Sequence, residues 1–163
     1  MIDLDIDTFK KSFKSVVIAS IDNNGNAISS YAPIIFDGND MYIFISEVVE
    51  HFNALKFNPN KVEIMFLQDE SKAKTIFARI RLRYKVNAKI LNRDDDFNRL
   101  FSLLKEQQND ENIDIFYNMQ DFHFVKLIIK SGRFVKGFGM AYDIDENNKT
   151  HLANINSPHK FNK

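Results

Sequence analysis

The chain has 163 residues, of which 44% are hydrophobic, and its sixteen phenylalanines supply enough apolar surface for one folded core. Twenty-two basic residues balance twenty-two acidic ones without forming a basic block, which argues against nucleic acid as a partner, and the lack of cysteine excludes disulfides and thiolate-ligated metal sites. Because no apolar run is long enough to span a membrane and the N-terminus does not resemble a signal peptide, we expect a single soluble, cytoplasmic domain over residues 1–163.

The N-terminal segment is expected to form a short helix followed by three strands. Ile6, Phe9 and Phe13 have the spacing of one helical face, with Asp7 as a candidate N-cap. Asn24-Gly25 is a strong hairpin signal, because both residues tolerate a positive φ. The strands expected from the apolar pattern are residues 15–21, 27–36 and 41–45.

A second helix is expected directly after the third strand. Ser46 is a suitable N-cap, and Asn58-Pro59 stops the helix because proline restricts the residue before it. The apolar face of this helix would contain Val48, Phe52 and Leu55.

The most informative stretch runs from Lys61 to Leu91. An apolar strand, VEIMFLQ, and a charged turn, DESKAK, lead into the alternating run TIFARIRLRYKVNAKIL. Alternation predicts a long barrel strand half buried against a core. Its apolar face would contain Ala78, Ile80, Leu82, Tyr84, Val86 and Ala88, and its other face Phe77, Arg79, Arg81, Arg83 and Lys85. The cations are either a solvated face or an anion site, since guanidinium groups bind carboxylate or phosphate through two parallel hydrogen bonds.

The second half of the chain is expected to contain one helix and several strands. The acidic run at 93–96 favours a helix N-terminus, and the helix that follows has one apolar face. Ser131-Gly132 is predicted to be a turn between two strands. The helix face consists of Phe97, Leu100, Phe101 and Leu104, and the strands are residues 122–130, 133–139 and 141–144, with a last run from Lys149.

These elements predict a small antiparallel barrel with peripheral helices, because six or seven strands are joined mainly by hairpins. Gly137 and Gly139 indicate a barrel bend or close backbone approach and not a nucleotide loop, since no glycine-rich loop opens a helix.

Several blocks together resemble the HugZ/HutZ haem-utilisation proteins. That family belongs to the split-barrel superfamily of pyridoxamine 5′-phosphate oxidases and other FMN binders. The resemblance implies a mainly β, six-stranded antiparallel split barrel that forms a homodimer and binds haem near the subunit interface. The blocks are VVIASIDNNGNAISSYAPIIFDG, MYIFISEVVEHFNALKFNP, VEIMFLQDESKAKTIFARIRLRY, MQDFHFVKL and GRFVKGFGMAYDI.

The resemblance also implies a set of site residues. His159 would ligate the haem iron, with Asp121 bound to its imidazole, and Arg79 and Arg81 would lie beside the ligand together with Lys160. A carboxylate on the second imidazole nitrogen fixes the tautomer and strengthens electron donation to the metal. The family tail tends to read Gly-His-Arg-Lys, whereas this chain has Pro-His-Lys-Phe at 158–161.

The function implied is oxidative haem degradation for iron acquisition, with Asp121 and Arg81 as catalytic residues and an external electron donor. Two alternatives remain open. One is an FMN-dependent oxidoreductase in which Lys74 and the arginines hold the flavin phosphate, and the other is a haem storage or transfer protein without turnover. Asp121 can also simply terminate a turn, and Arg79 and Arg81 can serve in salt bridges.

The other three histidines are weaker candidates. His151, in the last expected strand, is the main rival of His159 as iron ligand. His51 is expected on a helix surface, and His123 alternates with apolar residues and is expected to be packed.

Overall fold

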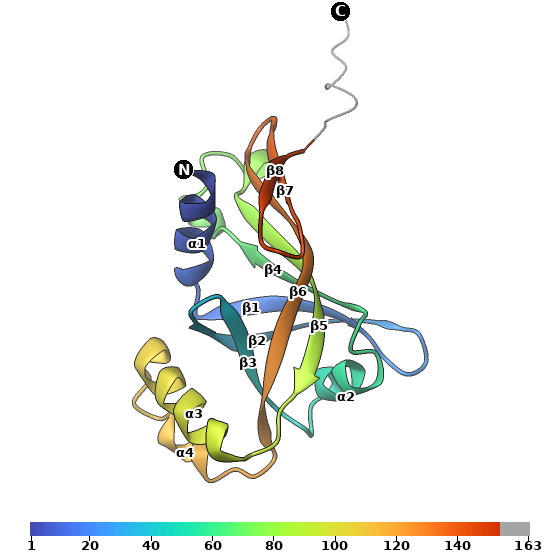
Figure 1. Cartoon of the computed structure of the whole chain (residues 1–163), viewed down its shortest axis with the longest axis vertical. Helices are drawn as coiled ribbons and strands as arrows, with labels where there is room; N and C mark the ends of the chain where they lie inside the picture. The colour runs from blue at the N-terminus through green and yellow to red at the C-terminus, as the bar shows by residue number, and fades with distance from the viewer. Residues whose placement is uncertain (154–163) are drawn as a thin grey trace, which may run out of the picture.

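The computed structural model describes residues 1–153, except for the side chains of Leu4 and Asp95. Six antiparallel strands form a closed barrel in the order β3-β2-β1-β4-β5-β6, with β3 pairing back onto β6 (Figure 1). The predicted six-stranded barrel is thereby confirmed. The barrel strands are β1 (Ser15–Ile21), β2 (Ala27–Asp37), β3 (Asp40–Ser46), β4 (Val62–Leu67), β5 (Arg81–Ile90) and β6 (Phe122–Gly137).

Two further strands extend the sheet beyond the barrel. β7 (Met140–Ile144) pairs with the second half of β6, and β8 (Thr150–Leu152) pairs with β7. The backbone N–H of Ala153 donates to the carbonyl of Ala141 at 2.9 Å. The described chain therefore ends beside β7, at the end of the barrel where β6 turns into β7 (Figure 1).

Alternating side chains fill the barrel. In β5 the residues from Leu82 to Ala88 at every second position are buried, as predicted, while Arg83 and Lys85 are exposed. β3 is buried on both faces, because its inner face lines the barrel and its outer face packs against α3. This outer layer is aromatic: the rings of Phe44 and Phe124 lie 4.6 Å apart, centroid to centroid.

Four α-helices and two 3₁₀ turns surround the barrel strands within residues 1–153. No helix in this range is long and apolar enough to cross a membrane. The short α4 was not predicted, because only one helix was expected in the second half of the chain. The elements are α1 (Ile2–Lys11), α2 (Glu50–Phe57), α3 (Asp95–Gln108), α4 (Asp114–Tyr117), η1 (Glu70–Lys72) and η2 (Ile76–Ala78).

The helix starts were predicted with mixed success. Asp94 caps α3 by accepting a hydrogen bond from the Asp96 N–H at 3.1 Å, which confirms the acidic start. The cap proposed at Asp7 is wrong, because α1 already begins at Ile2 and Asp7 forms an ion pair with Lys11 in its second half. Ser46 accepts from the Val48 N–H, yet α2 begins only at Glu50, so Ser46 is not its N-cap.

The central strand begins later than its alternation indicated. Thr75 accepts a hydrogen bond from the Phe77 N–H and starts the 3₁₀ turn η2. The side-chain carbonyl of Gln68 then accepts from the Ile80 N–H at 3.0 Å. These local hydrogen bonds replace ladder pairing before Arg81, so Phe77 and Arg79 do not belong to the strand face.

Ser131-Gly132 is not a turn. β6 runs without interruption from Phe122 to Gly137, and Gly132 pairs with Tyr84 of β5. A Cβ at Gly132 would lie 2.6 Å from Tyr84 Cδ1 and 2.8 Å from the backbone oxygen of Arg83. Glycine is required there because the buried tyrosine ring approaches the β6 backbone closely.

Replacing Gly132 with alanine is therefore expected to lower the free energy of unfolding by about 1–3 kcal/mol, since neither a backbone oxygen nor a fully buried ring can move away freely. Gly137→Ala is the matched control, because no atom lies within 4 Å of the added Cβ at that position of the same strand. Urea unfolding followed by circular dichroism measures both. Equal stability of the two variants would contradict the close approach.

Candidate functional site

A groove of about 330 Å³ is lined by residues of β5, by the end of β6 and by β7, where the sheet extends beyond the barrel. Arg81, Arg83 and Arg133 supply its positive charge. Its walls include apolar side chains that are exposed to solvent: Phe77 is 83% exposed, Phe138 64% and Met140 44%. The remaining lining residues are Ala78, Val135, Gly137, Gly139 and Ala141. Exposed aromatic surface beside arginines suits a ligand with a flat apolar body and anionic groups.

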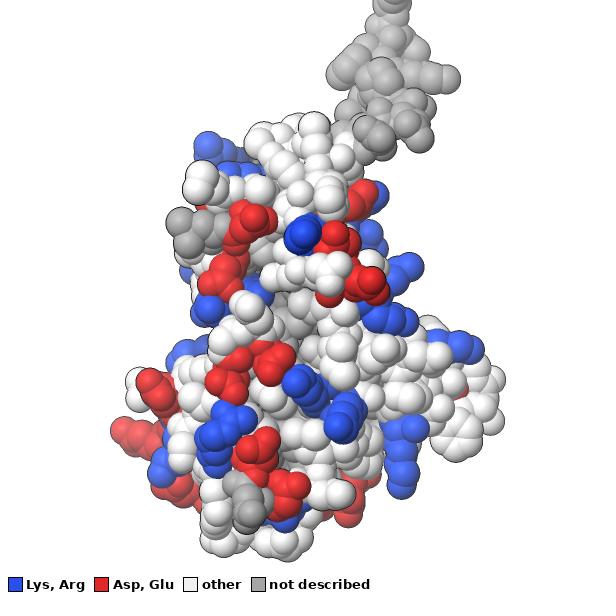
Figure 2. All heavy atoms as spheres, viewed as in Figure 1, with Lys and Arg blue, Asp and Glu red and all other residues white. Residues whose placement is uncertain are grey.

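Charge elsewhere is mixed. On the face shown in Figure 2, Lys and Arg side chains are interspersed with Asp and Glu, in line with the balanced composition. That face therefore shows no wide basic field, and the position of the groove's arginines beside exposed apolar side chains is a local feature.

Arg81 and Arg79 have different surroundings. Arg81 Nη1 donates to the carbonyl of Arg79 at 3.2 Å, and its partly buried side chain lines the groove. The guanidinium of Arg79 instead donates from Nε to the carbonyl of Gln68 at 2.9 Å and forms a 3.3 Å ion pair with Glu70. Arg79 thus fastens the segment between β4 and β5 and is not among the residues that line the groove. Its predicted role in cofactor binding stays a prediction.

Asp121 lies at the other end of β6, directly before Phe122. Ser46 Oγ donates to its carboxylate, and the Glu47 N–H donates to its backbone carbonyl at 2.8 Å. These bonds hold the connection between β3 and α2 against the start of β6. Asp121 is partly buried there, with one carboxylate oxygen engaged by Ser46.

Arg81 and Asp121 are not brought together within one chain. Arg81 pairs with Val135 near the end of β6, fourteen residues after Asp121. At about 3.3 Å per residue, that separation corresponds to a path of roughly 46 Å along the strand. The two ends of β6 lie far apart along the longest axis of the molecule (Figure 1). A site containing both residues would require a second copy.

The described histidines lie outside the groove. His123 is packed as predicted: its ring is 5.6 Å from that of Phe52, and Nε2 lies 3.1 Å from a carboxylate oxygen of Glu47. His151 is in β8 as predicted, 63% exposed, with Nε2 3.1 Å from Asp145. Burial lowers the pKa of His51 on α2. His159 and Lys160 lie outside the described residues.

Sequence reasoning missed part of the groove. Arg83 was considered as one of the cations of the strand face but was not assigned to the haem site, and Arg133, Phe138 and Met140 were not considered as ligand contacts. The available signal was the pair of glycines at 137 and 139, where the chain turns so that β7 pairs back along β6 and Met140 comes to line the same groove as Arg83. Lys74, considered for a flavin phosphate, is exposed and does not line the groove.

Comparisons with known proteins agree with this architecture. The family model described as pyridoxamine 5′-phosphate oxidase matches residues 2–136. Vibrio cholerae HutZ, named a heme oxygenase, is 31% identical over 156 residues, which cover 96% of this chain and 88% of HutZ.

Two solved structures extend the comparison. The crystal structure of Campylobacter jejuni ChuZ matches with a TM-score of 0.91 and 47% identity, covering 98% of this chain. This chain spans 65% of the ChuZ chain. A crystal structure of V. cholerae HutZ, described as a heme storage protein, matches with a TM-score of 0.75 and 34% identity, over 83% of this chain and 95% of that one. The chain therefore belongs to the pyridoxamine 5′-phosphate oxidase-like split-barrel family, in its HugZ/HutZ haem-utilisation branch.

Proposed function

We propose that this chain is a single split-barrel domain that binds haem at the interface of a homodimer and degrades it oxidatively. The observation that carries the proposal is the groove in which exposed aromatic side chains lie beside Arg81, Arg83 and Arg133. The names of the relatives, heme oxygenase and heme storage protein, support haem as the ligand.

The size of the groove supports a shared site. Ligand pockets usually enclose about 300–1,000 Å³, and the groove of about 330 Å³ is at the lower end of that range. Its aromatic walls fit the macrocycle and its arginines fit the propionates. A second copy would cover the remaining surface of the ring, which agrees with the exposure of Phe77 and Phe138.

His159 is the proposed iron ligand. It follows Ala153 by six residues, which span at most roughly 20 Å, and Ala153 is bonded to Ala141 in the wall of the groove. A histidine within that distance can ligate haem iron through one imidazole nitrogen. Lys160, the next residue, adds positive charge for a propionate.

Asp121 is proposed to act from the second copy. It lies at the opposite end of β6 from the groove, so the Asp121 that meets His159 belongs to the other protomer. Its carboxylate would accept the second imidazole N–H, hold the ring orientation and increase electron donation to iron. Ser46, already bonded to Asp121, fixes the carboxylate in place.

Haem supplies the redox chemistry, using oxygen and electrons from an external donor to open its own ring. The residues of the chain bind and orient it. Arg81 is held by the Arg79 carbonyl and would place a cation in the groove wall, where it would stabilise negative charge on a bound ligand. A storage role without turnover is the second candidate, favoured by the description of HutZ as a heme storage protein.

The test is a haemin titration followed by the Soret absorbance, with ascorbate then added in air. We expect saturable one-to-one binding and then bleaching of the Soret band as the ring opens. A Soret band that persists would replace degradation by storage. Binding of FMN in a parallel titration, with no binding of haemin, would contradict the proposal.

A further inference from the structure

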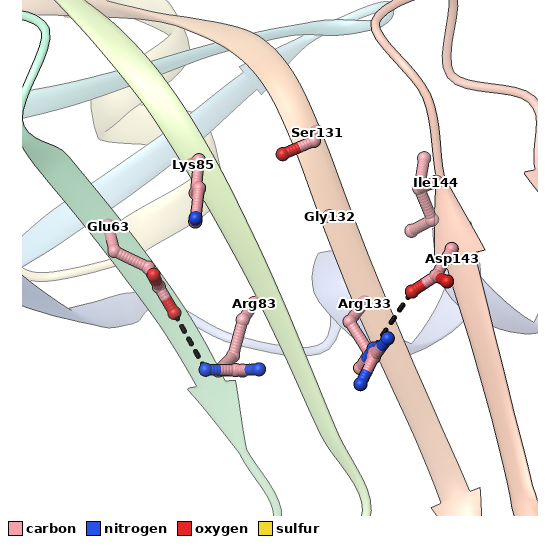
Figure 3. A pocket seen from close by; sticks show the side chains of 8 residues that line it. All are labelled: Glu63, Arg83, Lys85, Ser131, Gly132, Arg133, Asp143 and Ile144. Atoms are coloured by element: carbon pink, nitrogen blue, oxygen red, sulfur yellow. Dashed lines mark hydrogen bonds and ion pairs between the residues drawn. The ribbon is translucent and has the colours of Figure 1, made fainter. Parts of the chain in front are cut away.

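Two arginines face each other across adjacent strands. Arg83 of β5 and Arg133 of β6 are direct partners in the antiparallel register (Figure 3). Like charges in this position destabilise a strand pair, and half-exposed guanidiniums could otherwise separate into solvent. The pairing therefore carries an electrostatic cost unless anions lie close to the two groups.

Carboxylates on the neighbouring strands hold both arginines from the outside. Arg83 Nη1 donates to Glu63 Oε1 of β4 at 3.1 Å, and Arg133 Nε donates to Asp143 Oδ1 of β7 at 2.8 Å. Figure 3 shows these two bonds on opposite sides of the pair. Each flanking carboxylate thereby limits the motion of its guanidinium, which lowers the entropy cost of ordering that side chain when a ligand binds.

Most donors of the two guanidiniums are unused. An arginine offers five N–H donors, and within residues 1–153 each of these two makes one hydrogen bond. The small residues Ser131 and Gly132 precede Arg133 on β6 and line the same groove, and Lys85 adds a third cation. This second groove encloses about 280 Å³ and contains three cations against two carboxylates. The geometry fits a pair of carboxylates.

The two grooves share Arg83 and Arg133. On one side of the pair are the exposed apolar walls at Phe77, Phe138 and Met140, and on the other side is the polar floor at Ser131. A ligand lying across this boundary places its apolar body in one groove and its charged edge in the other. A ligand that fits both grooves is therefore apolar on one side of the two arginines and charged at the arginines.

We propose that Arg83 and Arg133 form a clamp for two carboxylates carried on one edge of the ligand. This inference rests on the proposed function and specifies how its ligand is oriented: Arg83 and Arg133 would hold the edge of the macrocycle that carries both propionates. The clamp fixes which edge of the macrocycle points into the protein and which edge remains open. Arg83 and Arg133 are positioning residues, and the iron is held independently of them.

The test compares haemin with haemin dimethyl ester, which keeps the iron and the ring but lacks both negative charges. We expect the wild-type protein to bind haemin about 10- to 100-fold more tightly than the ester, as loss of charge-assisted hydrogen bonds requires. Arg83→Gln with Arg133→Gln should remove this preference, with the affinity for the ester unchanged. The Soret position of bound haemin should also stay the same, because iron ligation is not altered.

Lys126→Gln is the matched control. Lys126 is also a cation on β6, paired with Asp40 at 3.2 Å, and lines neither groove, so its loss should leave the preference for haemin intact. Folding of the double variant is checked by its circular dichroism melting curve. It should be retained, since Glu63 and Asp143 are solvent-accessible and are not left as buried charges.

Equal binding of haemin and its ester by the wild-type protein would overturn the clamp and leave haem binding in place. Failure of the wild-type protein to bind either compound would overturn the proposed function and the clamp together. A loss of preference in Lys126→Gln equal to that in the arginine variant would show a general charge effect and likewise overturn the clamp.

Discussion

Replacing His159 with alanine is expected to abolish ligation of haem iron by this protein. Loss of a residue that only supports a metal ligand commonly costs about 10- to 100-fold in affinity, and loss of the ligand itself should cost at least as much. The haemin titration would show weaker binding and a shifted Soret band. Added imidazole should restore the original spectrum in the variant, because it replaces the missing ligand while the groove is unchanged.

His151→Ala is the control for that experiment. His151 is 63% exposed in β8 and lies near Asp145, so its removal should change neither the haemin affinity nor the Soret band. A spectrum lost in His151→Ala and kept in His159→Ala would assign the iron to His151 and refute the proposed role of the C-terminal tail.

The barrel was predictable because its signal is local. Alternation in β5 is a direct consequence of a strand with one face in the core, and Leu82, Tyr84 and Val86 are all completely buried. The Asn24-Gly25 hairpin was equally accessible, since Gly25 has φ +83° between β1 and β2.

The secondary-structure predictions were wrong where a side-chain hydrogen bond or a neighbouring strand determines the backbone conformation. Thr75 and Gln68 divert the segment before Arg81 into a 3₁₀ turn although its apolar alternation continues. Gly132 resembles a turn glycine in the sequence, and only its pairing with Tyr84 shows that it accommodates a buried ring. The contacts of Gln68 with Ile80 and of Gly132 with Tyr84 join residues far apart in the sequence, so a local pattern does not reveal them.

The sequence indicated several residues of the candidate site, but it did not indicate which of them lie close together. Resemblance to a family supplied Asp121 and Arg81 by position in the sequence. That Arg133 faces Arg83 follows from the register between β5 and β6, and that Asp121 lies far from Arg81 follows from the length of β6. Register and length are set by the whole barrel, so no local pattern reveals them.

The separation of Arg81 from Asp121 gives the proposed dimer a specific consequence. If each site takes Arg81 and His159 from one copy and Asp121 from the other, then Asp121→Ala and His159→Ala should complement each other in a mixed dimer. One of its two sites carries both substitutions, and the other carries neither. A mixed dimer isolated through two different affinity tags should therefore show about half the haem-degrading activity of the wild-type dimer.

Arg81→Ala combined with His159→Ala is the matched control. Both residues are assigned to the same copy, because the described chain ends at Ala153, which bonds to Ala141 in the groove wall that also contains Arg81. Each site of this mixed dimer then lacks one of them, and no activity should return. Recovery in this pair, with none in the Asp121 pair, would place Asp121 and His159 in one chain and Arg81 in the other. Because β6 separates Asp121 from the groove of its own chain, that result would require the C-terminal tail to cross to the partner. The iron ligand of each groove would then come from the second copy.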